Sequence, residues 1–276
     1  MNTSKHLSLA LGFLALGFSV AGQIAIAPSF VFIDPNSGVG NLFVSNNSQQ
    51  AFEVDISFLF GYPDSDADGA LVMNYEDSVA FKQYALDNMI RAFPRSFVLG
   101  PGEQRTIRLQ VIPSERRREG FFFTRMKVLA KPQTPEITEQ VAEGIGTKIS
   151  FNFEQVTAVF YRRGQVSTGL VVKHLDVRQS EGLLELRPHL KRSGNAPFLG
   201  SMLAKLKDGR GNVVAQTEST TTAYFDVIRR MDVPLADLKP GTYTLELTFE
   251  TRRNDMAATD LVQAPPLVHT ATVVVE

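Results

Sequence analysis

Apolar residues recur at every second position through most of the chain after residue 23, in short runs rich in Val, Ile, Phe and Thr. Clusters of Gly, Pro, Asn and Asp separate these runs, as in Asp34-Pro35-Asn36-Ser37-Gly38. A period of two places successive side chains on opposite faces of a strand, and the clusters supply turns. The pattern therefore predicts an all-β fold of short antiparallel strands, packed as sandwiches.

Length and charge narrow what such a chain can be. The 276 residues carry 28 Lys and Arg against 29 Asp and Glu, a net charge of −1. General nucleic-acid binders carry an excess of basic residues, which this chain does not have, so no nucleic acid is expected as a partner. The length suggests two domains of about 100–150 residues each. No Cys is present, which excludes disulfides, a thiolate nucleophile and Cys-bound metal.

The first 22 residues have the layout of a secretory signal peptide. Lys5 supplies the positive start, Leu7 to Ala21 is a mostly apolar run, and small residues precede Gln23. The run is shorter than the about 20 residues that a membrane-spanning helix needs. We therefore expect export through a cleaved signal peptide and no stable insertion into the membrane.

Two immunoglobulin-like β-sandwich domains in tandem are predicted after the signal peptide, over residues 23–164 and 165–276. The strands expected in the first domain are Gln23–Asp34, Gly40–Ser45, Ala51–Phe60, Ser96–Leu99, Gln104–Ile112, Gly120–Ala130 and Lys148–Tyr161. A short helix or irregular crossing is expected over Ser78–Ile90. The polar segment Lys131–Gly146 is long for a hairpin loop. It is either a functional loop or a disordered surface loop without a function.

The strands expected in the second domain are Leu170–Val177, Gly182–Leu190, Gly200–Leu206, Asn212–Gln216, Tyr224–Val233, Thr242–Thr251 and Leu267–Val275. The segment Lys207–Asn212 has the composition of a hairpin turn. Tyr243, near the start of its strand, fits a tyrosine corner, in which the hydroxyl returns to upstream backbone.

The acidic segment Asp64–Gly69 resembles the opening of a calcium-binding loop, with Asp at alternate positions and then Gly. Tyr75 stands where such a loop closes with Glu, and a strand precedes the segment. An acidic, solvated turn is therefore the preferred interpretation. The basic run Arg116–Arg118 is interpreted as a solvated turn, with a docking patch for an acidic partner as the alternative.

Catalytic motifs are missing from the sequence. The four His residues are scattered, and Ser167, Thr168 and the Thr-rich segment Thr217–Thr222 have no accompanying His and carboxylate in a known order. We therefore expect no enzyme, no cofactor and no bound metal, although carboxylates brought together by the fold would leave an enzyme or a metal-dependent binder open.

The most informative segment is the last expected strand of the first domain. Ile149, Phe151 and Phe153 alternate with polar residues, and from Val156 the apolar residues take the opposite parity. A bulge near Glu154-Gln155, or burial of both faces, would explain the change. Either the three large side chains fill the core of their own domain, or they form an exposed apolar edge that needs a partner.

Several segments together resemble the periplasmic pilus chaperones of the PapD type, which have two Ig-like domains. The matching segments are NLFVSNNSQQAFEVDISF, MIRAFPRSFVLGPGEQRTIRLQVIP, EGFFFTRMKVLAK and a strand that ends in FYRR. The second of these carries the pattern P-x-x-F-x-L-x-P-G followed by Arg108. The resemblance covers residues 24–165 well, and residues 166–276 only as a second Ig-like domain that is longer than usual.

The resemblance implies donor-strand complementation. Such a chaperone completes the unfinished Ig fold of a pilus subunit with its own strand, and later surrenders the subunit to an outer-membrane usher. By position, Ile149, Phe151 and Phe153 match the donor residues. The implied function is chaperoning of surface-fibre subunits in the periplasm, without nucleotide.

One feature departs from the family. The family anchors the carboxyl terminus of the subunit with an Arg and a Lys in the cleft between the domains, and these positions fall near Phe30 and on Ala158. Neighbouring cations that could substitute are Lys148, Arg125, Arg162 and Arg163. The alternative is a secreted structural or adhesive two-domain protein, accessory to a surface fibre, whose strand edge would be fully paired.

Overall fold

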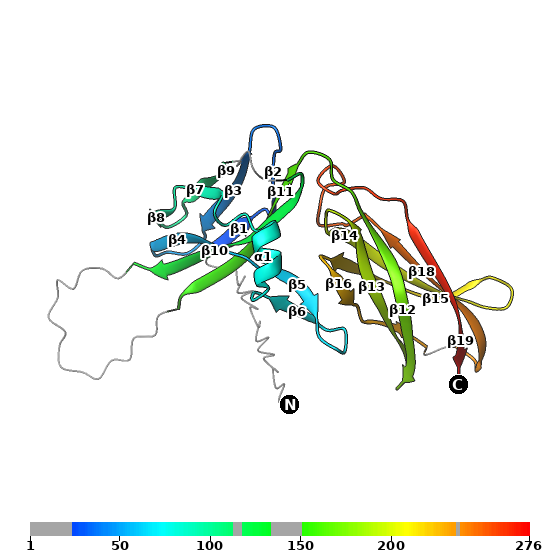
Figure 1. Cartoon of the computed structure of the whole chain (residues 1–276). Coiled ribbons are helices and arrows are strands. Elements are labelled where there is room, and N and C mark those ends of the chain that lie inside the picture. Colours follow the sequence, from blue (N-terminus) through cyan, green and yellow to red (C-terminus); the bar gives the residue numbers. More distant parts are fainter. Residues whose placement is uncertain (1–23, 113–117, 134–150, 236–237) are drawn as a thin grey trace, which may run out of the picture.

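A computed structural model describes residues 24–112, 118–133, 151–235 and 238–276 of the chain. Within these ranges the regular structure is almost entirely strand, with one short helix. Figure 1 shows two β-sandwiches joined at one end, which confirms the predicted all-β fold of two tandem sandwiches. None of the helical structure in these ranges is long and apolar enough to cross a bilayer. The predicted signal peptide lies outside the described residues.

The first sandwich is made of two sheets that bury one core. One sheet has the order β1 (Ile24–Ala27), β3 (Val39–Asn46), β9 (Gln104–Val111), β7 (Ile90–Phe93). The other has the order β2 (Phe30–Ile33), β11 (Phe153–Arg163), β10 (Gly120–Pro132), β4 (Phe52–Leu59), β8 (Ser96–Leu99). Leu42 and Ile107 from the first sheet meet Ile56, Phe122 and Val159 from the second, and all five are buried.

The prediction of a single first strand over Gln23–Asp34 is wrong. The segment forms β1 and β2, which belong to different sheets and are separated by Pro28-Ser29. Proline has no amide hydrogen to donate, so a ladder cannot continue through Pro28. The break lets the chain cross from one sheet to the other and brings β2 beside β11.

The helix predicted within Ser78–Ile90 is confirmed but is shorter, since α1 covers Ser78–Tyr84 and β7 starts at Ile90. Asp77 caps the helix, because its Oδ1 atom accepts hydrogen bonds from the amides of Val79 and Ala80 at 3.0 and 2.8 Å. Between β4 and α1 the sequence analysis missed a hairpin, β5 (Tyr62–Ser65) and β6 (Leu71–Asn74). The acidic segment is the connection of this hairpin, and the acidic-turn interpretation fits its place.

Asn46, at the end of β3, is the most heavily hydrogen-bonded buried side chain of the first sandwich. Its amide nitrogen donates to the carbonyls of Gln50, Leu99 and Gly100 at 2.7, 3.2 and 2.9 Å. Its Oδ1 atom accepts from both the amide and the hydroxyl of Ser48. One side chain therefore ties the β3–β4 turn to the end of β8.

We expect Asn46→Ala to lower the free energy of unfolding by about 3 kcal/mol, because it removes a buried side chain and leaves the carbonyls of Gln50, Leu99 and Gly100 without this donor. Denaturant unfolding of the purified protein would measure this change. The control is Asn47→Ala at the exposed neighbouring position, which should change stability by less than about 0.5 kcal/mol. Equal stability of both variants would contradict the assigned role of Asn46.

The second sandwich follows the same plan. One sheet has the order β12 (Thr168–Ser180), β13 (Leu183–Gly194), β16 (Asp226–Ile228), with β17 (Met231–Pro234) also paired to β13. The other has the order β15 (Val213–Ala223), β14 (Phe198–Lys207), β18 (Gly241–Glu250), β19 (Leu267–Val275). Leu186 and Val233 pack against Met202, Leu245 and Phe249 in its core.

Two local predictions in this domain are confirmed. The hydroxyl of Tyr243 donates to the carbonyl of Lys239 at 2.8 Å, which is the expected tyrosine corner. Asp208 closes the β14–β15 turn by accepting from the amides of Arg210 and Asn212. The single strand predicted over Tyr224–Val233 is wrong, because β16 and β17 are separated at Arg229 and Arg230. The side chain of Arg229 turns inward there, and its contacts are described below.

A third apolar cluster lies where the two sandwiches meet. Phe123 of β10 is at its centre, with ring centroids 4.6 Å from Tyr224 of the second sandwich and 5.2 Å from Phe60 of the first. Tyr62 of the β5–β6 hairpin stacks on Tyr224 at 5.7 Å. The sandwiches are thus packed against each other through aromatic rings. The predicted boundary between residues 164 and 165 stays a prediction and falls in the link between β11 and β12.

Candidate functional site

Strand β11 has one side that is only partly paired. It pairs with β10 along its whole length, from Phe153 opposite Ala130 to Arg163 opposite Gly120. On its other side β2 pairs with it, in parallel, only from Ala158 to Tyr161. In the part of the chain that the structure describes, Phe153–Thr157 therefore offer free backbone groups on one side, as an edge strand does.

The change of apolar parity in this strand comes from burial on both faces. The register between β10 and β11 is continuous, so there is no bulge at Glu154-Gln155. From Thr157 to Tyr161 every residue is buried, because one face covers the core of the first sandwich and the other faces the second sandwich. Of the two explanations offered by the sequence, the second is correct.

The structure separates the three predicted donor residues. Phe151 precedes β11 and is 67% exposed, so it does not fill the core of its own domain. Phe153 is half-buried and packs edge-to-face on Phe52, with ring centroids 5.7 Å apart. Ile149 and the possible anchor Lys148 lie outside the described residues. The assignment of donor roles stays a prediction.

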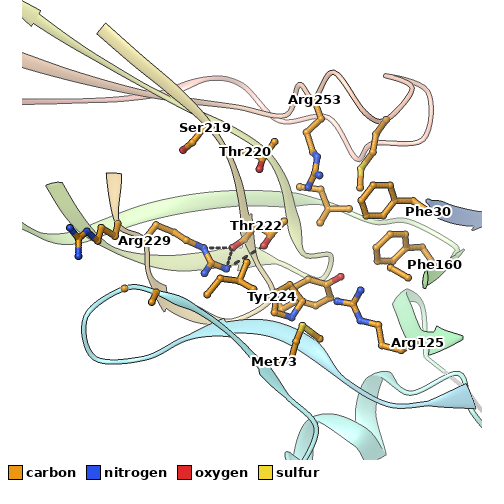
Figure 2. Close-up of a pocket in the computed structure, with 18 of the residues that line it drawn as sticks. Phe30, Met73, Arg125, Phe160, Ser219, Thr220, Thr222, Tyr224, Arg229 and Arg253 are labelled. Atoms are coloured by element: carbon orange, nitrogen blue, oxygen red, sulfur yellow. Dashed lines mark hydrogen bonds between the residues drawn. The ribbon is translucent and has the colours of Figure 1, made fainter. Parts of the chain in front are cut away.

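A pocket of about 540 Å³ lies beside the point where β2 begins to pair with β11. Its walls come from both sandwiches and from the β5–β6 hairpin, as Figure 2 shows for the labelled side chains. Phe30, Ala158 and Phe160 line it from the first sandwich, and Thr222 and Tyr224 line it from the second. The pocket therefore exists only when the two domains are packed together.

Arg125 brings a positive charge to the part of the pocket that Phe30 and Ala158 line. Phe30 and Ala158 are direct neighbours across the β2–β11 ladder, and Arg125 is paired with Ala158 on the other side. The Nε atom of Arg125 donates to the carbonyl of Gly61 at 3.2 Å, and the side chain lines the pocket. Arg162, in contrast, bonds the carbonyl of Thr259 and is not among the pocket-lining residues.

Arg229 is a second guanidinium of the pocket and is buried. It donates from Nε and one terminal nitrogen to the carbonyl of Thr222, at 3.1 and 2.6 Å, and from the other terminal nitrogen to the carbonyl of Asp64 at 3.0 Å. Burial lowers its pKa, while the negative charge of Asp64 acts in the opposite direction. Among the described residues no carboxylate lies within ion-pair distance of Arg229 or Arg125.

The remaining arginines of the pocket are already paired with carboxylates. Arg253 lies over the ring of Phe30 and forms an ion pair with Asp255. Arg230 forms ion pairs with Glu185 and Asp232. Arg125 and Arg229 are therefore the arginines of the pocket without an ion-pair partner among the described residues, which favours an anionic ligand.

Tyr224 forms part of the floor of the pocket between these cations. Its burial raises the pKa of its hydroxyl, and the charges of Arg125 and Arg253 oppose that shift. Figure 2 shows the guanidinium of Arg125 beside the Tyr224 ring. The phenol thus stays protonated at neutral pH. The arrangement is suited to binding an anion next to an aromatic wall.

The carboxylates of the acidic hairpin connection have partners within the protein. Asp66 accepts hydrogen bonds from the amides of Asp68 and Ala70, both at 2.9 Å. Asp68 pairs with Arg187 of the second sandwich at 3.0 Å. Within the described ranges no three His, Cys, Asp or Glu side chains converge as metal ligands would. The connection acts as a contact between the domains.

Sequence reasoning missed the residues that the second domain contributes to the pocket. Arg229 and Arg253 lie more than a hundred positions from Phe30 in the sequence, and no local pattern links them. The only available signal was the pair Arg229-Arg230, which interrupts an otherwise alternating apolar strand. Two adjacent charges at such a place indicate a break in the strand.

The sequence matches no protein-family model, and no curated protein sequence matches it. Solved structures with a similar course of the chain include the YadV chaperone (TM-score 0.42, 13% identity, covering 91% of this chain and 100% of that chain). The CupB2 chaperone of Pseudomonas aeruginosa has a TM-score of 0.41 at 11% identity, covering 89% and 98%. The complex of the SafB chaperone with the SafA pilin from Salmonella enterica has 0.39 at 11% identity, covering 91% and 96%.

Proposed function

We propose that this protein is a periplasmic chaperone for surface-fibre subunits, which it binds by lending strand β11 to their incomplete Ig fold. The observation that carries the proposal is the edge Phe153–Thr157 of β11, which within the described ranges pairs on one side only and is preceded by the exposed Phe151. An exposed strand edge with an apolar residue is a liability unless a partner covers it. A subunit that lacks one strand has the complementary defect.

The physics of such a complex is β-augmentation. Backbone hydrogen bonds along β11 supply affinity, and alternate side chains that enter the groove of the subunit set the register. We assign this role to Ile149 and Phe151. We propose that Phe153 contributes while remaining packed against Phe52, so that it couples the donated strand to the core of the chaperone.

The position of β2 suggests how the bound chain runs. A client strand beside Phe153–Thr157 would be collinear with β2 and must leave the sheet where Phe30 meets Ala158. The pocket with Arg125 opens at this point. A strand parallel to β11 would bring its carboxyl terminus there, whereas an antiparallel one would bring an ammonium group to uncompensated arginines. We therefore propose a parallel client strand whose terminal carboxylate is anchored by Arg125.

Export through the predicted signal peptide, and delivery of the client to an outer-membrane usher, complete the proposal. We propose no catalytic step and no cofactor. A secreted structural or adhesive protein would have its strand edge fully paired. Within the described residues the edge of β11 is paired on one side only over Phe153–Thr157, which favours the chaperone.

We expect Phe151→Asp to reduce the amount of client that co-purifies with the exported protein by at least about tenfold, because a charge would enter an apolar groove. The melting temperature should not change, since the side chain is 67% exposed. The measurement is affinity purification from the periplasm, with identification of the bound subunits by mass spectrometry. Phe153→Asp, in contrast, should also lower the melting temperature, because Phe153 packs on Phe52.

A matched control is Val79→Asp on α1, which changes an equally exposed apolar residue away from the edge of β11. It should leave the recovery of client unchanged. Unchanged recovery with Phe151→Asp would refute the donor role of this residue. Failure of the parent protein to recover any β-rich subunit would favour the structural or adhesive alternative.

A further inference from the structure

The pocket between the sandwiches has an apolar half that an anchored carboxylate does not use. Leu71 and Met73 of β6 line it together with Phe30, Phe160, Leu199 and Met256. Leu71 is 65% exposed, although the hairpin that carries it is docked on the second sandwich. An exposed apolar wall beside uncompensated arginines fits a ligand that has an apolar group next to its negative charge.

We infer that the β5–β6 hairpin selects the last residue of the client, through Leu71 and Met73, in favour of a large apolar side chain. This inference rests on the proposed function, because it takes the carboxyl terminus of the client as the occupant of the pocket. The charges of Arg125 and Arg229 fit a carboxylate. A client strand beside β11 must end or leave the sheet where Phe30 pairs with Ala158, so we take that carboxylate to be the end of the client chain.

The hairpin can act as a selective wall because four polar contacts hold it to the second sandwich. The carbonyls of Asp64 and Gly69 accept from the Arg229 side chain and the Arg230 amide, at 3.0 and 3.3 Å. Ser65 accepts from the amide of Ile228 at 2.9 Å, and the carboxylate of Asp68 pairs with Arg187. Because the hairpin is held in place, it need not change conformation when a ligand binds. Ligands whose side chains differ in shape should therefore differ in affinity.

Close packing at Gly69 supports a preformed wall. This residue has φ +80°, and a Cβ atom placed on it would lie 3.1 Å from the amide nitrogen of Arg230 and 3.3 Å from the carbonyl carbon of Arg229. Only glycine fits such a backbone approach without strain. The turn of the hairpin is therefore pressed directly onto the segment that carries Arg229.

The space in the pocket is also larger than a carboxylate requires. Its about 540 Å³ lies within the range of sites that enclose whole small ligands. A terminal residue whose carboxylate reaches Arg125 would place its side chain between Met73 and Phe160, which Figure 2 shows on the same side of the pocket as Arg125. Burial of a large apolar side chain there should strengthen binding about tenfold or more relative to alanine.

The test uses the full mature protein and short fluorescent peptides that are identical except for the last residue, which is Leu, Phe, Ala or Asp. A further peptide ends in leucine amide. We expect the Leu and Phe peptides to bind about tenfold more tightly than the Ala peptide, and the Asp peptide to bind least among the acids. The amide should bind more weakly than the acid. Fluorescence polarisation measures the dissociation constants, extended to millimolar peptide by ligand-observed NMR.

The decisive variant is Leu71→Ala combined with Met73→Ala. It should remove most of the preference for Leu over Ala but keep the preference for acid over amide. Val79→Ala, at the same exposure outside the pocket, should keep both preferences. A Leu-to-Ala ratio that is near one in the parent, or that survives the double substitution, would overturn the inference.

The same experiment separates this inference from the proposed function. A free-acid preference without side-chain selection leaves the anchor and the chaperone in place and removes only the role of the hairpin. No binding of any peptide at millimolar concentration also overturns the inference. The chaperone function would in that case still be decided by the recovery of client with Phe151→Asp, which does not depend on the pocket.

Discussion

Arg125→Ala is expected to weaken client binding by about 2 kcal/mol or more, which is roughly 30-fold in the dissociation constant. Arg125 lies opposite Ala158 in the β10–β11 ladder, where the free edge of β11 ends, and no carboxylate within the described residues forms an ion pair with it. Removing it leaves the terminal carboxylate of the client buried without its partner. The cost to folding should be small, about 1 kcal/mol, because one bond to the Gly61 carbonyl is lost.

The measurement is the amount of each subunit that co-purifies with the parent protein and with the variant, at equal expression. Arg162→Ala is the matched control, because Arg162 also follows from the sequence as a possible anchor but bonds Thr259 away from the pocket. Arg125→Lys should recover part of the binding, because it keeps the positive charge. It should not recover all of it, because an ammonium group cannot make the two parallel hydrogen bonds of a guanidinium. A larger loss with Arg162→Ala than with Arg125→Ala would contradict the assignment.

Phe123→Ala is expected to lower the free energy of unfolding by about 3–5 kcal/mol, the usual cost of removing a buried phenyl ring. Phe123 is buried at the centre of the interdomain cluster, in contact with Phe60, Tyr84 and Tyr224. The loss falls on the surface that joins the sandwiches. We therefore also expect the parent protein to unfold in one transition and the variant in two, because each sandwich keeps its own core.

Calorimetry, with denaturant unfolding followed by Tyr fluorescence, would measure both effects. Phe93→Ala is the control, because Phe93 is 53% exposed on β7 and lies outside the cluster. Its stability should be within about 1 kcal/mol of the parent. A Phe123→Ala protein that unfolds in one transition with parental stability would show that the sandwiches are not coupled through this ring.

The interdomain cluster also explains why the pocket depends on both domains. The ring of Tyr224 packs on Phe123 in the cluster, and the same residue lines the pocket. The β5–β6 hairpin contributes Tyr62 to the same cluster and Met73 to the lining of the pocket, and Figure 1 shows the hairpin extending from the first sandwich toward the second. A weaker interface should therefore weaken client anchoring even where no pocket residue is changed.

Much of the fold follows from local patterns in the sequence. Period-two runs identified most strands, including β9, β10 and β18, since a half-buried strand repeats on every second residue. The tyrosine corner at Tyr243 and the turn at Asp208 were also predictable, because short-range hydrogen bonds fix them. Two predictions failed at Pro28 and at Arg229-Arg230, where one apolar pattern continues across a break and the chain changes direction. The β5–β6 hairpin was missed altogether.

The candidate site was predictable only on the side of β11. The strand predicted over Lys148–Tyr161 located β11, which begins at Phe153. The alternation of Ile149, Phe151 and Phe153 did not separate the exposed Phe151 from the half-buried Phe153. Both residues have the same parity and hydrophobicity. Only the position of Phe52 on β4, far away in the sequence, decides that one of them joins the core and the other does not.

The sequence by itself determined the two sandwiches and the faces of most of their strands, because these depend on spacing between near neighbours. The tertiary structure decided where the positive charge lies. Arg125 reaches the pocket through the β10–β11 register, and Arg229 reaches it through bonds to Thr222 and Asp64 from opposite domains. Such contacts join segments that no periodicity connects, so their positions become visible only when the sheets are paired and the domains are packed.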